Sequence, residues 1–258
     1  LNTPLFSDYA QKKRFIYLPE GSVIEYHPTE VFDFPVGTVL IKNFYYDDVQ
    51  LINQKGLIIE TRLLIKKASE WLALPYIWNS EQTDAILEIT GGVQEISLLG
   101  KKPIYYQIPN MGQCKGCHQR NGTLQPIGST ARQLNRNHID DRGDSINQLR
   151  RLSRLGLLNV SEKEVFPKLS VWNDPKTGSL DERARAYLEM NCAHCHRKEG
   201  PAKNSGLYLM SSSKSRHALG IMKAPVAAGS GSGQLAYDIV PGQPEASILL
   251  YRINSTEP

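Results

Sequence analysis

The first hundred residues alternate between apolar and polar positions in short runs. In 57–66 (LIIETRLLIK), Glu60 and Arg62 share one face of an extended chain, and the other face carries Ile59, Thr61, Leu63 and Ile65. Glycines and an Asn79-Ser80 pair separate such runs. The expected strands are 38–46, 57–66, 71–78, 85–89, 93–98 and 104–108. This spacing predicts an antiparallel sheet or small sandwich.

After Pro109 the apolar residues recur at helical spacing. Residues 145–155 repeat an apolar side chain every third position, and a helix is expected to begin near Asn110. Ser179 and Glu182 have the spacing of a capping box, which predicts a helix that runs toward the second cysteine pair. A last helix is expected to begin at Pro244.

All four cysteines lie in two copies of one pattern, C-x-x-C-H. The spacing is that of covalently attached haem c, in which two thiols add to the haem vinyl groups and the following histidine binds the iron. The sequence therefore predicts two haem c groups. Their attachment residues are Cys114, Cys117 and His118 for the first, and Cys192, Cys195 and His196 for the second.

Two other uses of the cysteines were weighed, zinc knuckles and redox dithiols. Neither explains a histidine directly after the second cysteine of both pairs. The 74 residues between Cys117 and Cys192 are also unusual for paired zinc knuckles.

The spacing of the two motifs favours two haem modules. His118 and His196 are 78 positions apart, about the length of a small c-type cytochrome domain. The expected fold is therefore α+β, an N-terminal antiparallel β-rich domain followed by two mainly α-helical cytochrome c-like modules. The expected boundaries are 1–108, 109–178 and 179–258, the last module being incomplete at its C-terminus.

The second axial ligand of each iron separates an electron carrier from an enzyme, because an open coordination site admits peroxide or gases. His138, 20 positions after His118, is the candidate for the first haem, with an ordinary surface histidine as the alternative. Met222, 26 positions after His196, is the candidate for the second, although a core methionine is the commoner use of that residue.

Composition limits the remaining classes. The net charge of +4 in 258 residues is too small and too evenly spread to indicate nucleic-acid binding. No apolar run approaches the ~20 residues of a membrane-spanning helix. Because haem c is attached outside the cytoplasm, a periplasmic or cell-surface location is expected. The start at Leu1 indicates a removed leader or a fragment.

Several phrases resemble known bacterial sequences. PGQPEASILLYRI (241–253) resembles the segment before the Met-Pro loop of c-type cytochrome domains, which implies a distal methionine beyond Pro258 and competes with Met222. More widely, the chain resembles an uncharacterised bacterial family of exported di-haem cytochromes. The phrases are FPVGTVLIKNFYY (34–46), IETRLL (59–64), WN-x-x-QTDA (78–85), CKGCH (114–118), ARQLN (131–135), NCAHCH (191–196) and APVAAGSGSG (224–233).

This resemblance implies two covalent haems and an exported protein. Family members are often lipoproteins, and some are encoded beside parallel β-helix repeat proteins, which makes a lipid anchor and a β-helix partner compatible with it. The expected function is electron transfer between extracytoplasmic redox proteins. The alternatives are a di-haem peroxidase-like enzyme with one open haem, and a haem-containing subunit or sensor.

Overall fold

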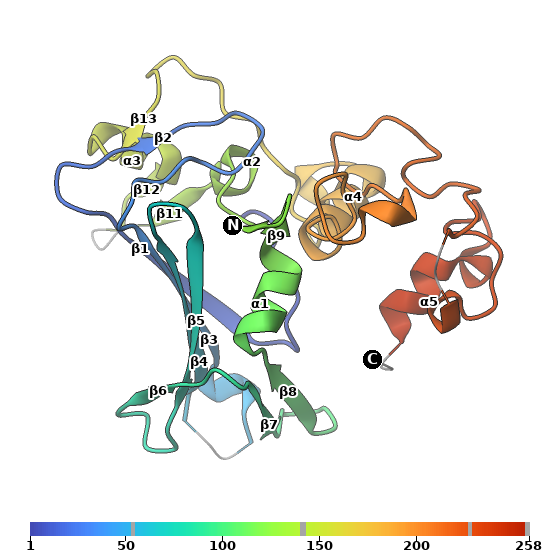
Figure 1. Ribbon diagram of the computed structural model, residues 1–258, viewed down its shortest axis with the longest axis horizontal. Helices are drawn as coiled ribbons and strands as arrows, with labels where there is room; N and C mark the ends of the chain where they lie inside the picture. Colours follow the sequence, from blue (N-terminus) through green and yellow to red (C-terminus); the bar gives the residue numbers. More distant parts are fainter. Residues whose placement is uncertain (53–54, 140–142, 227–228, 256–258) are drawn as a thin grey trace. The chain divides into compact units, whose positions relative to one another are not determined.

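The computed structural model describes residues 1–52, 55–139, 143–226 and 229–255. The chain divides into two compact units (Figure 1). Unit 1 comprises Leu1–His118 and Gly122–Leu169, and unit 2 comprises Gln119–Asn121 and Ser170–Pro258. Most of the first expected module, 109–178, thus belongs to the same unit as the β-rich segment. Within the phrase 224–233 and the last expected module, positions 227–228 and 256–258 lie outside the described residues.

Unit 1 is built around a five-stranded antiparallel sheet, which confirms the β-rich N-terminal segment. The strand order is β1-β3-β4-β5-β6. The central strands β3, β4 and β5 place buried side chains in the core, and a bulge after Phe44 shifts the register between β3 and β4. The strands are β1 Gln11–Tyr17, β3 Val39–Tyr46, β4 Leu57–Lys66, β5 Trp71–Trp78 and β6 Ala85–Leu87.

Two hydrophobic clusters lie in unit 1. The first joins the sheet to a hairpin of β7 Gly92–Ile96 and β8 Ile104–Ile108, through the fully buried Phe44 and Tyr106. The second cluster lies further along the sheet, around Trp71 and Leu149. A short 3-10 turn, η1 Asp48–Gln50, follows β3.

Short elements surround the second cluster. Asn147 caps α3 by accepting hydrogen bonds from the backbone N–H groups of Leu149 and Arg150, so this helix begins three residues after the expected start at 145. The elements are β2 Ile24–Glu25, α1 Met111–His118, β10 Thr123–Leu124, α2 Ala131–Leu134, β11 Asn137–Ile139, β12 Ser145–Asn147, α3 Gln148–Arg154 and β13 Leu158–Asn159.

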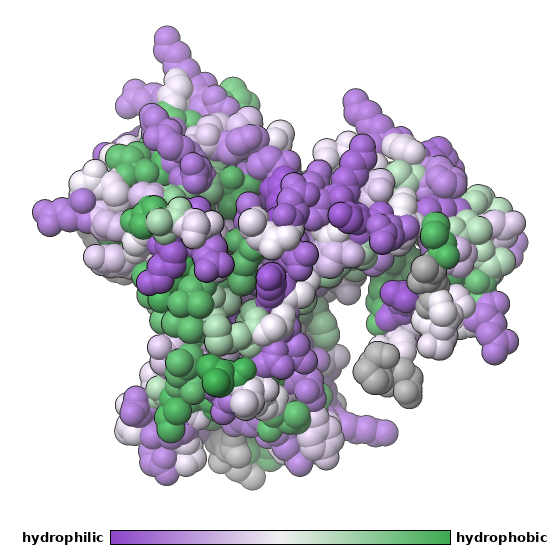
Figure 2. Space-filling model, viewed as in Figure 1, coloured by the Kyte–Doolittle hydropathy of each residue, from purple (hydrophilic) through white to green (hydrophobic). Residues whose placement is uncertain are grey.

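The other face of the sheet is only partly covered. Phe15 and Tyr17 are more than half exposed, and their cross-strand partners Ile41 and Val39 are half-buried. Apolar side chains accordingly reach the surface over the sheet region in Figure 2.

The described residues of unit 2 form two α-helices, which are linked by long irregular segments. The capping box of Ser179 and Glu182 opens α4, as the sequence predicted. Pro244 begins a 3-10 turn rather than the last helix, which starts at Ile248. The elements are β9 Gln119–Arg120, η2 Pro175–Thr177, α4 Leu180–Asn191, η3 Lys203–Ser205, η4 Gly229–Ser232, η5 Pro244–Ala246 and α5 Ile248–Asn254.

The prediction of two mainly α-helical cytochrome modules was wrong. In the described ranges the α-helices number five and span four to twelve residues, and most of unit 1 after α1 consists of short strands and turns. Residues 197–247 contain eleven glycines and prolines. These residues end helices, because proline lacks the backbone donor and glycine carries the largest backbone entropy cost.

Candidate haem-attachment sites

The first C-x-x-C-H motif lies on α1. Asn110 and Gln113 cap this helix reciprocally, since each side-chain oxygen accepts a hydrogen bond of 2.8 Å from the other's backbone N–H. Cys114 is buried, Cys117 is exposed one turn later, and both are present as thiols. His118 is the last helical residue. The helix therefore brings both thiols and the imidazole to consecutive turns.

One ring nitrogen of His118 is held by the backbone. Its Nδ1 lies 2.8 Å from the carbonyl oxygen of Gln125. A carbonyl oxygen only accepts, so Nδ1 carries the hydrogen and Nε2 keeps its lone pair. Metal-binding histidines commonly donate their second N–H in this way. Burial first, and then the charges of Lys42 and Arg62, lower the pKa of His118 to about 4.

A buried polar cluster on the sheet acts electrostatically on the first motif. Glu60 is fully buried, and its carboxylate accepts hydrogen bonds from Arg62 at 2.8 and 2.5 Å. The Tyr106 hydroxyl donates to the same carboxylate at 2.6 Å. Burial raises the pKa of the Cys114 thiol, and the Arg62 charge opposes this increase.

The second motif lies in a turn where α4 ends. Asn191 is the last residue of the helix, and Cys192 is its C-cap. The Cys192 carbonyl accepts from the backbone N–H of Cys195 at 3.1 Å and of His196 at 2.9 Å. The five residues therefore form a compact turn, in contrast to the helical first motif.

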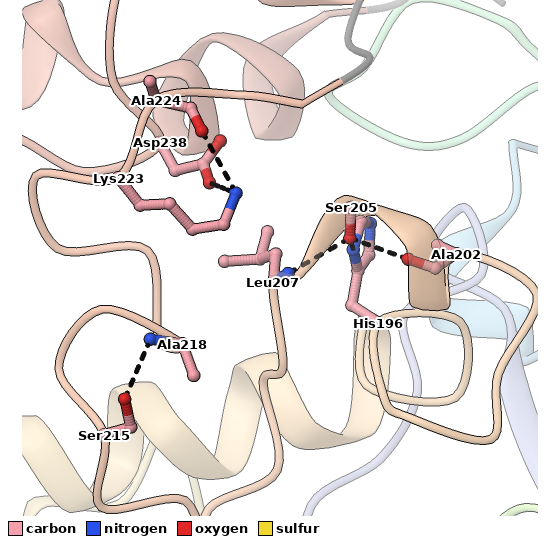
Figure 3. A network of polar contacts seen from close by, with 9 residues as sticks. All are labelled: His196, Ala202, Ser205, Leu207, Ser215, Ala218, Lys223, Ala224 and Asp238. Carbon is pink, nitrogen blue, oxygen red and sulfur yellow. Dashed lines mark hydrogen bonds and ion pairs between the residues drawn. The ribbon is translucent and has the colours of Figure 1, made fainter.

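A serine holds the imidazole of His196. Its Nδ1 lies 3.3 Å from the Ser205 hydroxyl, which itself donates to the carbonyl of Ala202 at 2.7 Å (Figure 3). With the hydroxyl hydrogen used in this way, Ser205 accepts from His196, and Nε2 again keeps its lone pair. Burial, followed by the charge of Arg252, lowers the pKa of His196.

Gly200 lies against the backbone of the second motif, where a side chain would not fit. A Cβ at Gly200 would lie 2.3 Å from the Cys195 carbonyl oxygen. The same carbonyl accepts from the backbone N–H of Ala202 at 3.1 Å. Gly200 and Ser205, like Gln125 in unit 1, were not identified from the sequence. The only signal in the sequence was the Gly200-Pro201 pair, which indicates a turn but does not show which residues that turn contacts.

An ion pair lies near His196. The Lys223 ammonium is 3.2 Å from the Asp238 carboxylate, both side chains are nearly buried, and the ammonium also donates to the Ala224 carbonyl at 3.2 Å. Figure 3 shows this pair and His196 on opposite sides of Leu207. Both charges act on the pKa of His196, in opposite directions.

The proposed distal residues lie at exposed positions. His138 is in β11, opposite Ile146, and is exposed. Met222 is 49% exposed and has a left-handed backbone with φ of 52°. Their roles as axial ligands stay predictions, as does that of a methionine beyond Pro258.

The donor sets of both motifs are suited to haem c. Each motif supplies two thiols and an imidazole whose Nε2 is available for iron. The Nδ1 of His194, inside the second motif, is buried without a hydrogen-bond partner among the described residues. Over the same residues, no group of three or more His, Cys, Asp or Glu side chains is placed to hold a metal ion.

Comparisons with known proteins provide no relative. No family model matches the chain, and neither the curated proteins nor the solved structures yield a similar protein. In the described part of the chain, none of the helices combines the length and the apolar character needed to cross a membrane.

Proposed function

We propose that the protein is a di-haem c-type cytochrome that passes electrons between redox partners outside the cytoplasm. The observation that carries this proposal is that both C-x-x-C-H histidines have Nδ1 engaged, one by Gln125 and one by Ser205, and Nε2 available. Metal-binding histidines commonly donate their second N–H in this way, and the same arrangement occurs here in two different local structures.

The chain's own residues would attach and orient the groups. Cys114 and Cys117 would form thioether bonds to the first haem, and Cys192 and Cys195 to the second. Bound haem supplies reversible one-electron chemistry at its iron. The hydrogen bond on each Nδ1 fixes the ring plane and increases the basicity of Nε2, which would favour ferric iron and lower the reduction potential of a bound haem.

Haem content tests the attachment. The chain would be produced in the periplasm of a host with c-type maturation, extracted with acidified acetone, and assayed by the pyridine haemochromogen spectrum. We expect two extraction-resistant haems per chain. The double variants Cys114→Ala/Cys117→Ala and Cys192→Ala/Cys195→Ala should each retain one haem. Absence of haem from the unmodified chain would overturn the proposal.

Carbon monoxide separates electron transfer from the enzymatic alternative. The absorbance spectrum of the dithionite-reduced protein should be unchanged by the gas if both irons are six-coordinate, as an electron carrier requires. A shift in about half of the absorbance would contradict pure electron transfer and support a peroxidase-like protein with one open haem. The variants His138→Ala and Met222→Ala would show whether either residue closes an iron site.

A further inference from the structure

Three cations lie side by side across neighbouring strands of unit 1. Arg14 of β1 is opposite Lys42 of β3, and Lys42 is opposite Arg62 of β4. Like charges directly opposite on adjacent strands destabilise a sheet. These three cations nevertheless occupy the sheet face between the two hydrophobic clusters. The presence of three adjacent cations at this position requires an explanation.

The sheet does not supply enough negative charge to neutralise all three cations of this row. Glu60 neutralises Arg62 through two hydrogen bonds. Lys42 and Arg14 form no hydrogen bond or ion pair within the described ranges. Lys42 and Arg62 instead both stack on Phe44, each with its charged group 4.3 Å from the ring centroid. Two positive charges therefore lie against one aromatic ring, and of these two only Arg62 has a matching carboxylate.

Two members of the row, Lys42 and Arg62, lie toward the first motif. The charges of Lys42 and Arg62 act on His118, and that of Arg62 acts on Cys114. The helix α1, which carries both motif residues, packs against β5, and β5 is the neighbour of β4 (Figure 1). An anionic group attached to this helix would thus find its counter-charges on the sheet.

We propose that Lys42 and Arg14, supported by Arg62, bind the ionised propionate groups of a haem attached to Cys114 and Cys117. This inference rests on the proposed function, because it requires a haem at the first motif. Haem carries two carboxylates, and a cationic site for them offsets the repulsion within the row. Haem loading would then stabilise unit 1 as well as supply its redox centre.

The test compares Lys42→Met with Lys13→Met in the haem-loaded protein. Lys13 is in the same sheet, opposite Asn43, on the other face, and its ammonium lies over Tyr45. Lys42→Met should shift the propionate bending band in the resonance Raman spectrum, and Lys42→Arg should restore it. Lys13→Met should leave the band unchanged.

Reduction potentials provide a second readout. Removing a positive charge favours ferric haem, so Lys42→Met should lower one of the two potentials. We expect about a tenfold change in the reduction equilibrium constant, for a unit charge in a medium of effective dielectric about 20. For one electron this is about 59 mV. Lys42→Arg and Lys13→Met should leave both potentials near their original values.

The outcomes separate the two proposals. If haem is bound at both motifs and Lys42→Met changes neither the Raman band nor a potential, the propionate site is wrong and the cytochrome proposal stands. If both lysine variants change the band equally, the effect is not specific to this face and the propionate site is again wrong. If the unmodified chain binds no haem at Cys114 and Cys117, both proposals fail.

Discussion

The two motifs share a five-residue pattern but differ in what supports them. The first lies on a helix whose surroundings come from distant parts of the chain, such as Lys42 on β3 and the Glu60–Arg62 pair on β4. The second lies in a turn supported by neighbours within ten residues, Gly200 and Ser205. The same C-x-x-C-H sequence is thus supported by strands of the sheet in the first motif and by a nearby loop in the second.

This difference predicts different sensitivities. A site supported by distant strands depends on the stability of the whole unit, whereas a site supported by nearby residues fails when one local contact is changed. Substitutions in β4 should therefore affect the first motif through global unfolding. Substitutions at Gly200 or Ser205 should affect the second motif alone.

The largest effect is expected for Glu60→Ala. The substitution leaves the largely buried Arg62 without its carboxylate and removes the hydrogen-bond acceptor of Tyr106. Removing one partner of a buried ion pair costs about 3 kcal/mol. The free energy of unfolding, measured by denaturant titration, should fall by about this amount.

The matched control for that variant is Asp181→Ala. This carboxylate pairs with Arg185 one turn along α4 and is largely exposed. Exposed pairs of this kind contribute about 0.5 kcal/mol. Equal losses in the two variants would mean that the buried pair does not support unit 1.

Gly200→Ala is expected to have the next largest effect, on the second motif only. The new Cβ would lie 2.3 Å from the Cys195 carbonyl oxygen, so the backbone must move. Overpacking of this kind costs about 1–3 kcal/mol. Haem content should fall toward one per chain, with the remaining haem mapped by peptide mass spectrometry to Cys114 and Cys117.

Gly116→Ala, inside the first motif, is the control and should have the opposite sign. No atom lies within 4 Å of a Cβ at this position, which is in the middle of α1. Replacing a helical glycine with alanine stabilises by about 0.5–1 kcal/mol. A loss of haem at both motifs in Gly200→Ala would show that the two sites are not independently supported.

Ser205→Ala tests the hydrogen bond on His196. Without the hydroxyl, Nδ1 loses its acceptor at a cost of about 1 kcal/mol. A less basic Nε2 favours ferrous iron, so the potential of one haem should rise while the other is unchanged. The exposed Ser212→Ala provides the control. An unchanged pair of potentials in Ser205→Ala would remove the axial role assigned to this contact.

The sequence predicted the positions of the motifs better than it predicted the residues that surround them. The alternation in 57–66 predicted β4, and the Ser179–Glu182 spacing predicted the start of α4, because both signals are local. The same alternation placed Glu60 and Arg62 on one face but did not show that this face is buried. Burial depends on the β7–β8 hairpin, which packs on the sheet from more than thirty positions away.

The helical modules were predicted wrongly for a related reason. The attachment motif indicates chemistry, and the two helical modules were expected from the 78-position spacing of the motif histidines and from apolar residues at helical spacing after Pro109. The sequence between Arg197 and Ser247 contains eleven glycines and prolines, which disfavour helices, and hydrogen bonds such as Leu209 N–H to the His196 carbonyl form in the loops. Loop contacts of this kind have no periodicity, so Gly200 and Ser205 could not be recognised as partners of the motif.

The smallest effect concerns the capping box that begins α4, the helix that leads into the second motif. Hydrogen bonds from the Ser179 backbone N–H and hydroxyl lower the pKa of Glu182 below 4.5. A carboxyl whose folded pKa is depressed contributes stability that is full above its unfolded pKa and is lost as the pH falls through the folded pKa.

Acidification from pH 5 should therefore loosen the start of α4, measured as faster amide hydrogen exchange there. The variant Glu182→Ala, which removes the acceptor of the Ser179 N–H and hydroxyl, should show the faster exchange already at neutral pH and little further change on acidification. The reciprocal cap of α1, formed by Asn110 and Gln113, contains no ionisable group. Exchange in α1 should therefore not follow the same titration, and a common titration of both helices would contradict the independent support of the two motifs.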